Sequence, residues 1–201
     1  MPNTTNYSFP TPADTDLVKN GADAIRDLGD AVDTAMNTAL GTKKSGMVLL
    51  SSVAFNGVAS QSVSNVFSAT YQNYIFTWNV TCAATTELWL RLRTASDDSG
   101  NNYYGNRTTM QFSSSTVTGG NYNADSKINF GEGFAEQSAG FANIMNPNVS
   151  SRTLCLIQHY GNDRWNPSGF QTGVSTQYTG ITILGGTQNI TGSVSVYGYN
   201  K

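Results

Sequence analysis

The chain of 201 residues is long enough for one ordinary domain and an appendage. Only 12% of its residues are charged, about half of the usual ~25%, and the formal net charge is −2. A nearly neutral chain has no basic field to attract nucleic acid, and no stretch reaches the ~18 consecutive apolar residues of a membrane span. The composition therefore predicts neither nucleic-acid binding nor membrane insertion.

The N-terminal part divides into two predicted segments. Residues 1–11 are polar and aromatic without a period, which predicts an extended arm. A helix is predicted over residues 12–41, because Pro12 suits a first helical position and Gly41 follows the last apolar residue. Its small and apolar residues recur at spacings of three and four, as in a coiled-coil seam of about three heptads. The predicted oligomerisation seam consists of Val18, Gly21, Ile25, Leu28, Val32, Ala35 and Ala39.

This seam is thin, because Gly21, Ala35 and Ala39 bury little apolar area. We therefore expect the helix to be unstable alone and to need partners. The 3.5-residue period favours a stalk shared between copies of the chain. A helix folded back onto the β-domain of its own chain is the alternative, and the seam does not decide how many copies assemble.

From residue 46 to residue 201 the pattern is that of short strands. Apolar and polar residues alternate most clearly over 74–80, 87–93 and 190–197. Further strands are predicted near 47–55, 60–69, 107–113, 126–130, 151–160 and 178–184, while 131–147 is weakly patterned and predicts a loop or a poor strand. A mainly β fold follows, with an antiparallel β-sandwich of jelly-roll type over residues 46–201.

The sequence shows little catalytic chemistry. Cys82 and Cys155 follow no metal-binding spacing, and two buried free thiols in neighbouring strands are favoured over a disulfide, although the sequence does not decide. His159 is the sole histidine and ends a predicted strand. The few acids after residue 45 show no selected pair for glycosidic cleavage. We therefore predict no catalytic residue, no metal site and no cofactor.

Two loops combine aromatic rings with short amides, around residues 101–106 and 160–166. Aromatic faces can stack on sugar rings, while Asn, Asp and Arg side chains hydrogen-bond to hydroxyl groups. The aromatics could equally lie in the core or at a subunit interface. The candidate receptor-binding residues are Tyr103, Tyr104, Asn162, Asp163, Arg164 and Trp165.

Three segments carry a family resemblance. They are SFPTPADTDLV at residues 8–18 running into GADAI at 21–25, FSATYQNY at 67–74 with the strand 88–93 and the loop NNY at 101–103, and ITGSVSVYGY at 190–199. Together they resemble bacteriophage tail-fibre and virion appendage proteins. The resemblance implies a homotrimer, a distal β-domain, and attachment to another virion protein through the N-terminus, where Tyr7, Phe9 and Pro10 are the candidates.

The expected function is therefore that of a non-enzymatic structural protein on the exterior of a phage particle. The predicted fibre would be trimeric and would present its β-domain to a host-surface glycan. A capsid decoration protein or head fibre with a passive knob is the alternative, since the sequence does not separate tail from capsid. A small polysaccharide hydrolase is the third hypothesis for the function.

Overall fold

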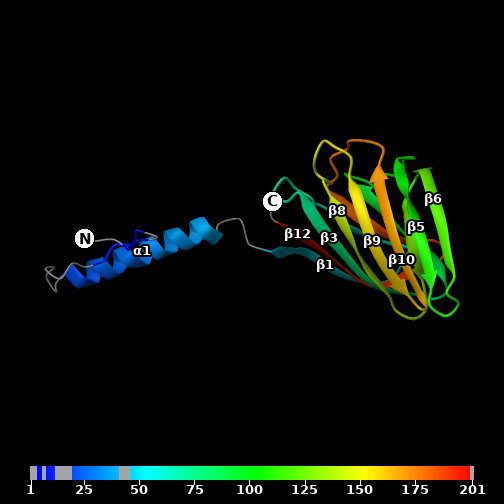
Figure 1. Ribbon diagram of the computed structural model, residues 1–201, viewed down its shortest axis with the longest axis horizontal. Coiled ribbons are helices and arrows are strands. Elements are labelled where there is room, and N and C mark those ends of the chain that lie inside the picture. The colour runs from blue at the N-terminus through cyan, green and yellow to red at the C-terminus, as the bar shows by residue number, and fades with distance from the viewer. Residues whose placement is uncertain (1–3, 6–7, 12–19, 41–45, 200–201) are drawn as a thin grey trace. The chain divides into compact units, whose positions relative to one another are not determined.

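The structure is a computed structural model that describes residues 4–5, 8–11, 20–40 and 46–199 (Figure 1). The chain divides into two compact units, residues 1–45 and residues 46–201. Tyr7, Val18 and the predicted start of the helix at residues 12–19 lie outside the described residues, as does the side chain of Ala39.

The first unit contains one helix, α1 (Gly21–Leu40). Asp23 lies in its first turn, where a negative charge is favourable, and pairs with Arg26. Two residues of the predicted seam are exposed, Ile25 to 71% and Leu28 to 37%, while the described seam residues Gly21, Val32 and Ala35 are half-buried. The structure describes a single chain, so the coiled-coil stalk stays a prediction. In the described parts of the chain, no helix combines the length and apolarity that a membrane crossing requires.

Backbone hydrogen bonds join the described residues of the N-terminal segment, and the extended arm stays a prediction. The backbone N–H of Thr4 donates to the carbonyl of Phe9, and the N–H of Ser8 donates to the carbonyl of Thr4. Ser8 adopts a left-handed backbone conformation with φ 54°. Phe9 and Pro10, two of the candidate attachment residues, are half-buried.

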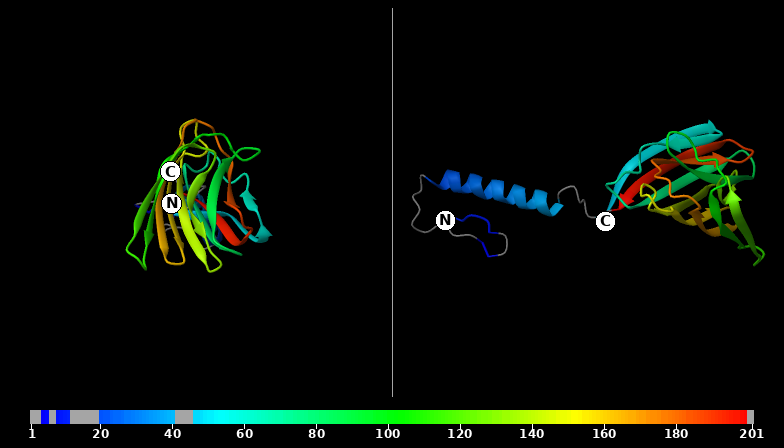
Figure 2. Two further views of the ribbon diagram at one scale, coloured as in Figure 1. Left: turned by 90° about the vertical axis from the view of Figure 1, so that its right-hand side faces the viewer. Right: turned by 90° about the horizontal axis from the view of Figure 1, so that it is seen from above.

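The second unit is built from twelve strands in two antiparallel sheets, as Figures 1 and 2 show. The strands are β1 (Met47–Val58), β2 (Ser60–Val63), β3 (Asn73–Cys82), β4 (Thr86–Arg93), β5 (Tyr103–Gln111), β6 (Val117–Asp125), β7 (Ile128–Gly133), β8 (Ser138–Met145), β9 (Leu154–Gly161), β10 (Arg164–Thr172), β11 (Gly180–Gly185) and β12 (Ile190–Tyr199). The large sheet has the order β1-β12-β3-β8-β9-β10-β5-β6, and the small sheet has the order β2-β11-β4-β7. This confirms a mainly β, sandwich-like fold. The jelly-roll topology stays a prediction.

The core lies between the sheets and follows from the alternation seen in the sequence. Tyr74, Phe76 and Trp78 of β3 are buried at every second position, and so are Leu88 and Leu90 of β4. Burial of such side chains contributes roughly 1.5–3 kcal/mol each to folding. The inward-facing residues of both sheets therefore provide most of the driving force for this domain.

Strands β6 and β10 were not predicted, and β8 lies in the segment 131–147, for which a loop and a poor strand were both left open. Each has small, polar or strand-breaking residues on its inward or outward positions, which weakens the period of two. Pro167 lies inside β10, although proline is usually confined to sheet edges. The register of β10 with β5 passes from Trp165 to Ser168 without pairing Pro167, while on the other side Pro167 pairs with Gln158 of β9.

Cys82 and Cys155 are both free and buried, which confirms the favoured prediction for the two thiols. They do not lie in neighbouring strands, however. Cys82 belongs to β3 and Cys155 to β9, and β8 runs between these strands in the large sheet.

Candidate functional site

Tyr103, one of the candidate receptor-binding residues, is a core residue. Its side chain is fully buried, its hydroxyl accepts the N–H of Leu92 at 2.9 Å, and it lies 3.2 Å from the carbonyl of Asp98, to which it can donate. Burial raises the pKa of Tyr103 well above its usual range. At Tyr103 the aromatic signal therefore reflects packing, and this ring cannot contact a ligand at the surface.

The hairpin between β9 and β10 uses its polar candidates to hold itself in place. Asn162 is exposed in the two-residue turn, with φ 49°. The carboxylate of Asp163 accepts hydrogen bonds from Ser113 and from Gln111 at 3.0 Å. These bonds lower the pKa of Asp163. Arg164 forms an ion pair with Glu132 of β7, so it fastens this hairpin to the small sheet.

Tyr104 and Trp165 lie on the outward face of the large sheet, far from each other. Trp165 stacks on Tyr160, with ring centroids 6.1 Å apart and planes 7° apart, and its indole N–H donates to Gln158 at 2.7 Å. Trp165 pairs with Met110 at one end of β5, whereas Tyr104 lies six residues away, about 20 Å along the strand. The two predicted binding loops therefore lie at opposite ends of the sheet.

The outward positions of five adjacent strands in this sheet share one property: they carry no charge in the described structure. We call this surface the uncharged face, and it consists of Asn73, Ile75, Thr77, Asn79, Thr81, Ala139, Phe141, Asn143, Met145, Leu154, Leu156, Gln158, Tyr160, Trp165, Pro167, Gly169, Gln171, Tyr104, Asn106, Thr108 and Met110.

His159 is a core residue whose ring nitrogens both have partners. Its Nδ1 accepts from the indole N–H of Trp78 at 3.2 Å, and its Nε2 lies 2.9 Å from the carbonyl oxygen of Glu132. A carbonyl only accepts, so Nε2 carries the proton and the ring is neutral. Burial, assisted by Arg107, lowers the pKa of His159 to about 3. This histidine is a structural residue.

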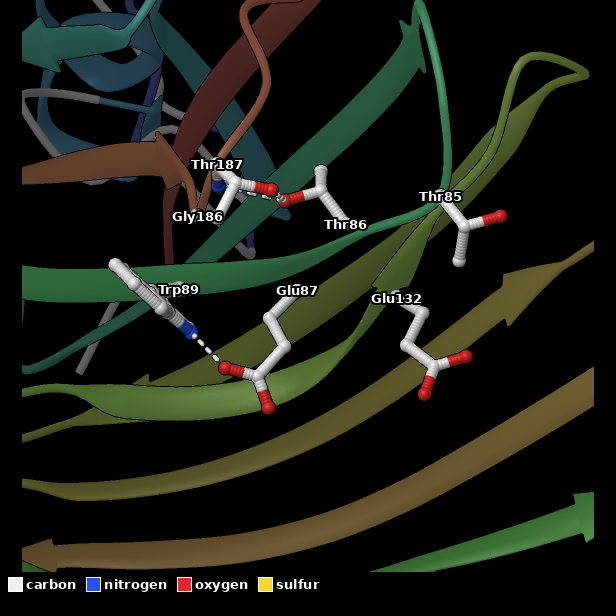
Figure 3. Close-up of a pocket in the computed structure, with 7 residues that line it drawn as sticks. All are labelled: Thr85, Thr86, Glu87, Trp89, Glu132, Gly186 and Thr187. Carbon is white, nitrogen blue, oxygen red and sulfur yellow. Dashed lines mark hydrogen bonds between the residues drawn. The ribbon is translucent and has the colours of Figure 1, made fainter.

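A shallow pocket of about 370 Å³ opens beside the small sheet (Figure 3). We call it the tryptophan pocket, and it is lined by Thr85, Thr86, Glu87, Trp89, Glu132, Gly186 and Thr187. In β4 the leucines at positions 88 and 90 are buried, so the alternation turns Glu87 and Trp89 outward. Figure 3 shows Glu132 on the neighbouring strand β7, beside them.

The two glutamates of the pocket face each other across the β4–β7 ladder. Glu87 and Glu132 are register partners, which places their Cβ atoms roughly 4.5–5.5 Å apart. Like charges at directly opposite positions destabilise a sheet. Arg164 offsets the charge of Glu132, while the described contacts of Glu87 are with neutral donors.

Glu87 is held in a defined orientation by two N–H donors. The indole N–H of Trp89 donates to one carboxylate oxygen at 3.1 Å, and the side-chain amide of Asn129 donates to the other at 2.8 Å. The amide oxygen of Asn129 in turn accepts from Arg107 at 2.7 Å. Each carboxylate oxygen of Glu87, a residue that lines the pocket, keeps further acceptor capacity.

The walls of the pocket are fixed by the loop between β11 and β12. The backbone N–H of Gly186 donates to the carbonyl of Glu87 at 2.8 Å, and that of Thr187 donates to the Thr86 hydroxyl at 2.8 Å. The ammonium group of Lys127 lies 4.4 Å from the centroid of the Trp89 ring, a cation–π contact that occupies one face of this indole. The pocket thus combines preorganised acceptors, hydroxyl groups and one aromatic ring.

This set of groups suits a ligand that is rich in hydroxyl groups. Ionised carboxylates accept hydrogen bonds from hydroxyl donors, and an indole packs against the C–H surface of a sugar ring. Among the described side chains, no three His, Cys, Asp or Glu residues gather as a metal site. The arrangement therefore points to binding by hydrogen bonds and stacking.

Sequence reasoning named none of these residues as candidates. The alternation over 87–93 places Glu87 and Trp89 on one face, and this signal could have selected half of the pocket. The partner Glu132 lies in a glycine-rich segment without clear period, and no local pattern predicts its pairing with β4.

No protein-family model matches the chain, and a search of curated proteins found no match. Among solved structures, the chain resembles a fructosyltransferase from A. japonicus with 12% identity and a TM-score of 0.38, covering 83% of this chain and 28% of that one. It also resembles the Ca2+-bound exoplasmic/lumenal domain of VIP36 with 9% identity and a TM-score of 0.33, covering 78% of this chain and 84% of that one. Both likenesses are too distant to carry an argument about function. The chain is a two-sheet, all-antiparallel β protein with an N-terminal helix.

Proposed function

We propose that the chain is a non-enzymatic structural protein on the exterior of a phage particle. Its N-terminal arm attaches to another virion protein, its helices assemble as a trimeric, coiled-coil-like stalk, and its β-sandwich of jelly-roll type binds a host-surface glycan through the tryptophan pocket. The resemblance of the N-terminal, central and C-terminal segments to virion appendage proteins supports the location. The groups that line the tryptophan pocket support a glycan as the ligand.

The pairing of Glu87 with Glu132 is the observation that carries the glycan proposal. Two acids in direct register cost up to ~1 kcal/mol of stability, so a purely structural pair would be better served by neutral residues. At a glycan site the same acids are useful, because each accepts from sugar hydroxyls while Trp89 covers the ring. The charge of Glu87, which no described cation pairs with, favours neutral sugars over sugars that carry carboxylates.

Binding fits this pocket better than hydrolysis. Glycosidic cleavage needs a carboxylic acid that donates a proton to the leaving oxygen. The donors that point at the two carboxylates are the N–H groups of Trp89, Asn129 and Arg164, which orient the acids as acceptors. A test for new reducing ends in host polysaccharide should therefore stay negative.

The exposed apolar side chains of α1 support the stalk. Ile25 is exposed to 71%, Met36 to 55% and Leu28 to 37%, which leaves apolar area that a second and third helix would cover. Assembly would place several pockets on one particle appendage. Individually weak sites then give strong retention through a high effective concentration.

The proposal is tested with the full-length protein on an array of neutral and acidic polysaccharides from host envelopes. We expect retention on neutral glycans, with at least ~10-fold weaker binding for Trp89→Ala and for Glu87→Gln, because each removes one recognised part of the sugar. Phe112→Ala, at an exposed aromatic ring outside the pocket, is the matched control. Equal retention of Trp89→Ala and wild type would refute the site.

Glu87→Gln has a second readout that separates binding from folding. The substitution removes the repulsion from Glu132 but turns an amide N–H toward one of the two N–H donors, Trp89 or Asn129. These effects oppose each other, so the free energy of unfolding should change by less than ~1 kcal/mol while glycan retention falls. Antibody labelling of particles then distinguishes a tail fibre from a capsid decoration, by label at the tail or on the shell.

A further inference from the structure

The uncharged face of the large sheet has the composition of a covered surface. Charged residues make up 12% of this chain, so an even distribution would place roughly two or three charges on the outward positions of these five strands. The described charged side chains of the β-domain lie instead on the small sheet, in loops, or on inward positions such as Arg107. Figure 1 shows β8, β9, β10 and β5 side by side in this sheet.

The centre of this face is aliphatic and aromatic. Leu156 is exposed to 55% and Tyr160 to 48%, and between them on β9 lies Gln158, whose register partner on β8 is Phe141. Contiguous exposed apolar groups of this kind mark interaction surfaces. Leucine and phenylalanine side chains offer no hydrogen bonds to sugar hydroxyls, so this patch fits an apolar protein surface better than a glycan.

Leu156 stands between two hollows on this face. One, of about 330 Å³, is lined by Tyr104, Leu154 and Gln171, among others; the second, of about 310 Å³, is lined by Asn143, Met145 and Tyr199, among others. Leu156 lines both. A projecting side chain flanked by hollows gives the relief that packed interfaces need.

We propose that the uncharged face is covered by the β-domain of a second copy of this chain. Copies of the same chain carry the same net charge, and a face without charges adds no like-charge repulsion to their contact. A partner with another sequence could carry charges complementary to charges on this face, but the face has none to pair with them. Tyr, Trp and Met, present here as Tyr160, Trp165 and Met145, are enriched at the centres of interfaces.

The size of the face is sufficient for stable contact. The five strands of the face, at ~4.8 Å spacing and with about seven residues each at ~3.3 Å, span roughly 24 by 23 Å, or ~550 Å² in projection. Two such faces in contact bury ~1,100 Å², which is above the ~1,000 Å² in total that a specific interface needs. The inference rests on the proposed stalk in one respect, because helix assembly would raise the local concentration of β-domains.

The test measures the association of the full-length protein by sedimentation equilibrium. Leu156→Glu places a charge in the centre of the contact and should raise the dissociation constant by at least ~100-fold. Phe112→Glu is the matched control, because Phe112 is exposed to 61% and lies outside the face; we expect a change below ~3-fold. Thermal unfolding of both variants checks that they fold.

Leu28→Asp, which disrupts the helix seam, separates this inference from the proposed stalk. If Leu28→Asp dissociates the protein and Leu156→Glu behaves like Phe112→Glu, the uncharged face is no interface and the inference is overturned. If Leu156→Glu dissociates the protein and Leu28→Asp does not, the face is confirmed and the stalk fails. A wild type that stays monomeric at high concentration would overturn both, while glycan retention by the tryptophan pocket is measured independently.

Discussion

Lowering the pH from 7 to 4 should destabilise the β-domain through the buried imidazole of His159. Its pKa is about 3 in the folded protein, against an ordinary value of 6.5, because burial disfavours the charged ring. Between these values the unfolded state binds more protons than the folded state, so stability rises with pH across this window. The contribution is fully present above pH 6.5 and is lost as the pH falls toward 3.

The size of the loss follows from the two pKa values. A pH of 4 lies ~2.5 units below the ordinary histidine pKa of 6.5, which applies to the unfolded state. At ~1.4 kcal/mol per unit, protonation of the unfolded chain lowers the free energy of unfolding by ~3 kcal/mol relative to pH 7. Protonation would also place a hydrogen on Nδ1, which now accepts from Trp78. Both effects act in the same direction.

The assay is urea unfolding followed by tryptophan fluorescence at pH 7, 5.5 and 4, with His159→Gln as the comparison. Glutamine keeps an acceptor and a donor but does not titrate. At pH 7 the variant should be ~1–3 kcal/mol less stable, because the buried hydrogen bonds are perturbed. By pH 4 the free energies of unfolding of the two proteins should converge, because only the wild type loses the contribution of the histidine. The carboxylates titrate equally in both proteins and do not affect the difference. A stability difference that stays constant with pH would refute the reasoning.

Three further predictions concern packing. A Cβ at Gly131 would lie 2.1 Å from the imidazole carbon Cδ2 of His159, so Gly131→Ala should lower the free energy of unfolding by ~1–3 kcal/mol in thermal melts. Gly119 has open space around it, so Gly119→Ala should change this free energy little. Burial raises the pKa of Cys155 to about 12, so this thiol should react with Ellman's reagent only after unfolding in guanidinium, when Cys82 reacts too; fast reaction of two thiols in native protein would contradict this. Tyr103→Phe should lower the free energy of unfolding in urea by ~1–3 kcal/mol and leave glycan retention unchanged, since the hydrogen bonds of its hydroxyl lie inside the domain. Weakened glycan retention would contradict this and indicate that Tyr103 takes part in binding.

The helix and the regular strands were predictable because their periods are local. The end of α1 at Leu40 agrees with the glycine signal at residue 41, and β3, β4 and β12 lie where the alternation of apolar residues is strongest. Strands β6 and β10 were missed, and β8 was left undecided between a loop and a poor strand, because glycine, asparagine or proline interrupt their patterns. They form nevertheless, because neighbouring strands supply hydrogen bonds and apolar contacts that a short segment alone cannot.

The candidate residues also differ in whether a local sequence signal could identify them. Composition was sufficient to mark the aromatic loops, but it could not tell the buried Tyr103 from the exposed Tyr160, since both belong to similar clusters of tyrosine, asparagine and glycine. The register of β4 against β7 brings Glu87 to Glu132, and no period within either segment contains that information.

By itself the sequence determined the mainly β character of residues 46–201, the helical segment before them and the low charge of the surface, because these depend on residue types and on short repeats along the chain. Only the tertiary structure decided which acids meet at the tryptophan pocket, that the histidine is neutral and buried, and that one broad face carries no charge. Pairing between distant strands sets all three, and its free energy is shared across the whole sandwich, so it leaves no local trace in the sequence.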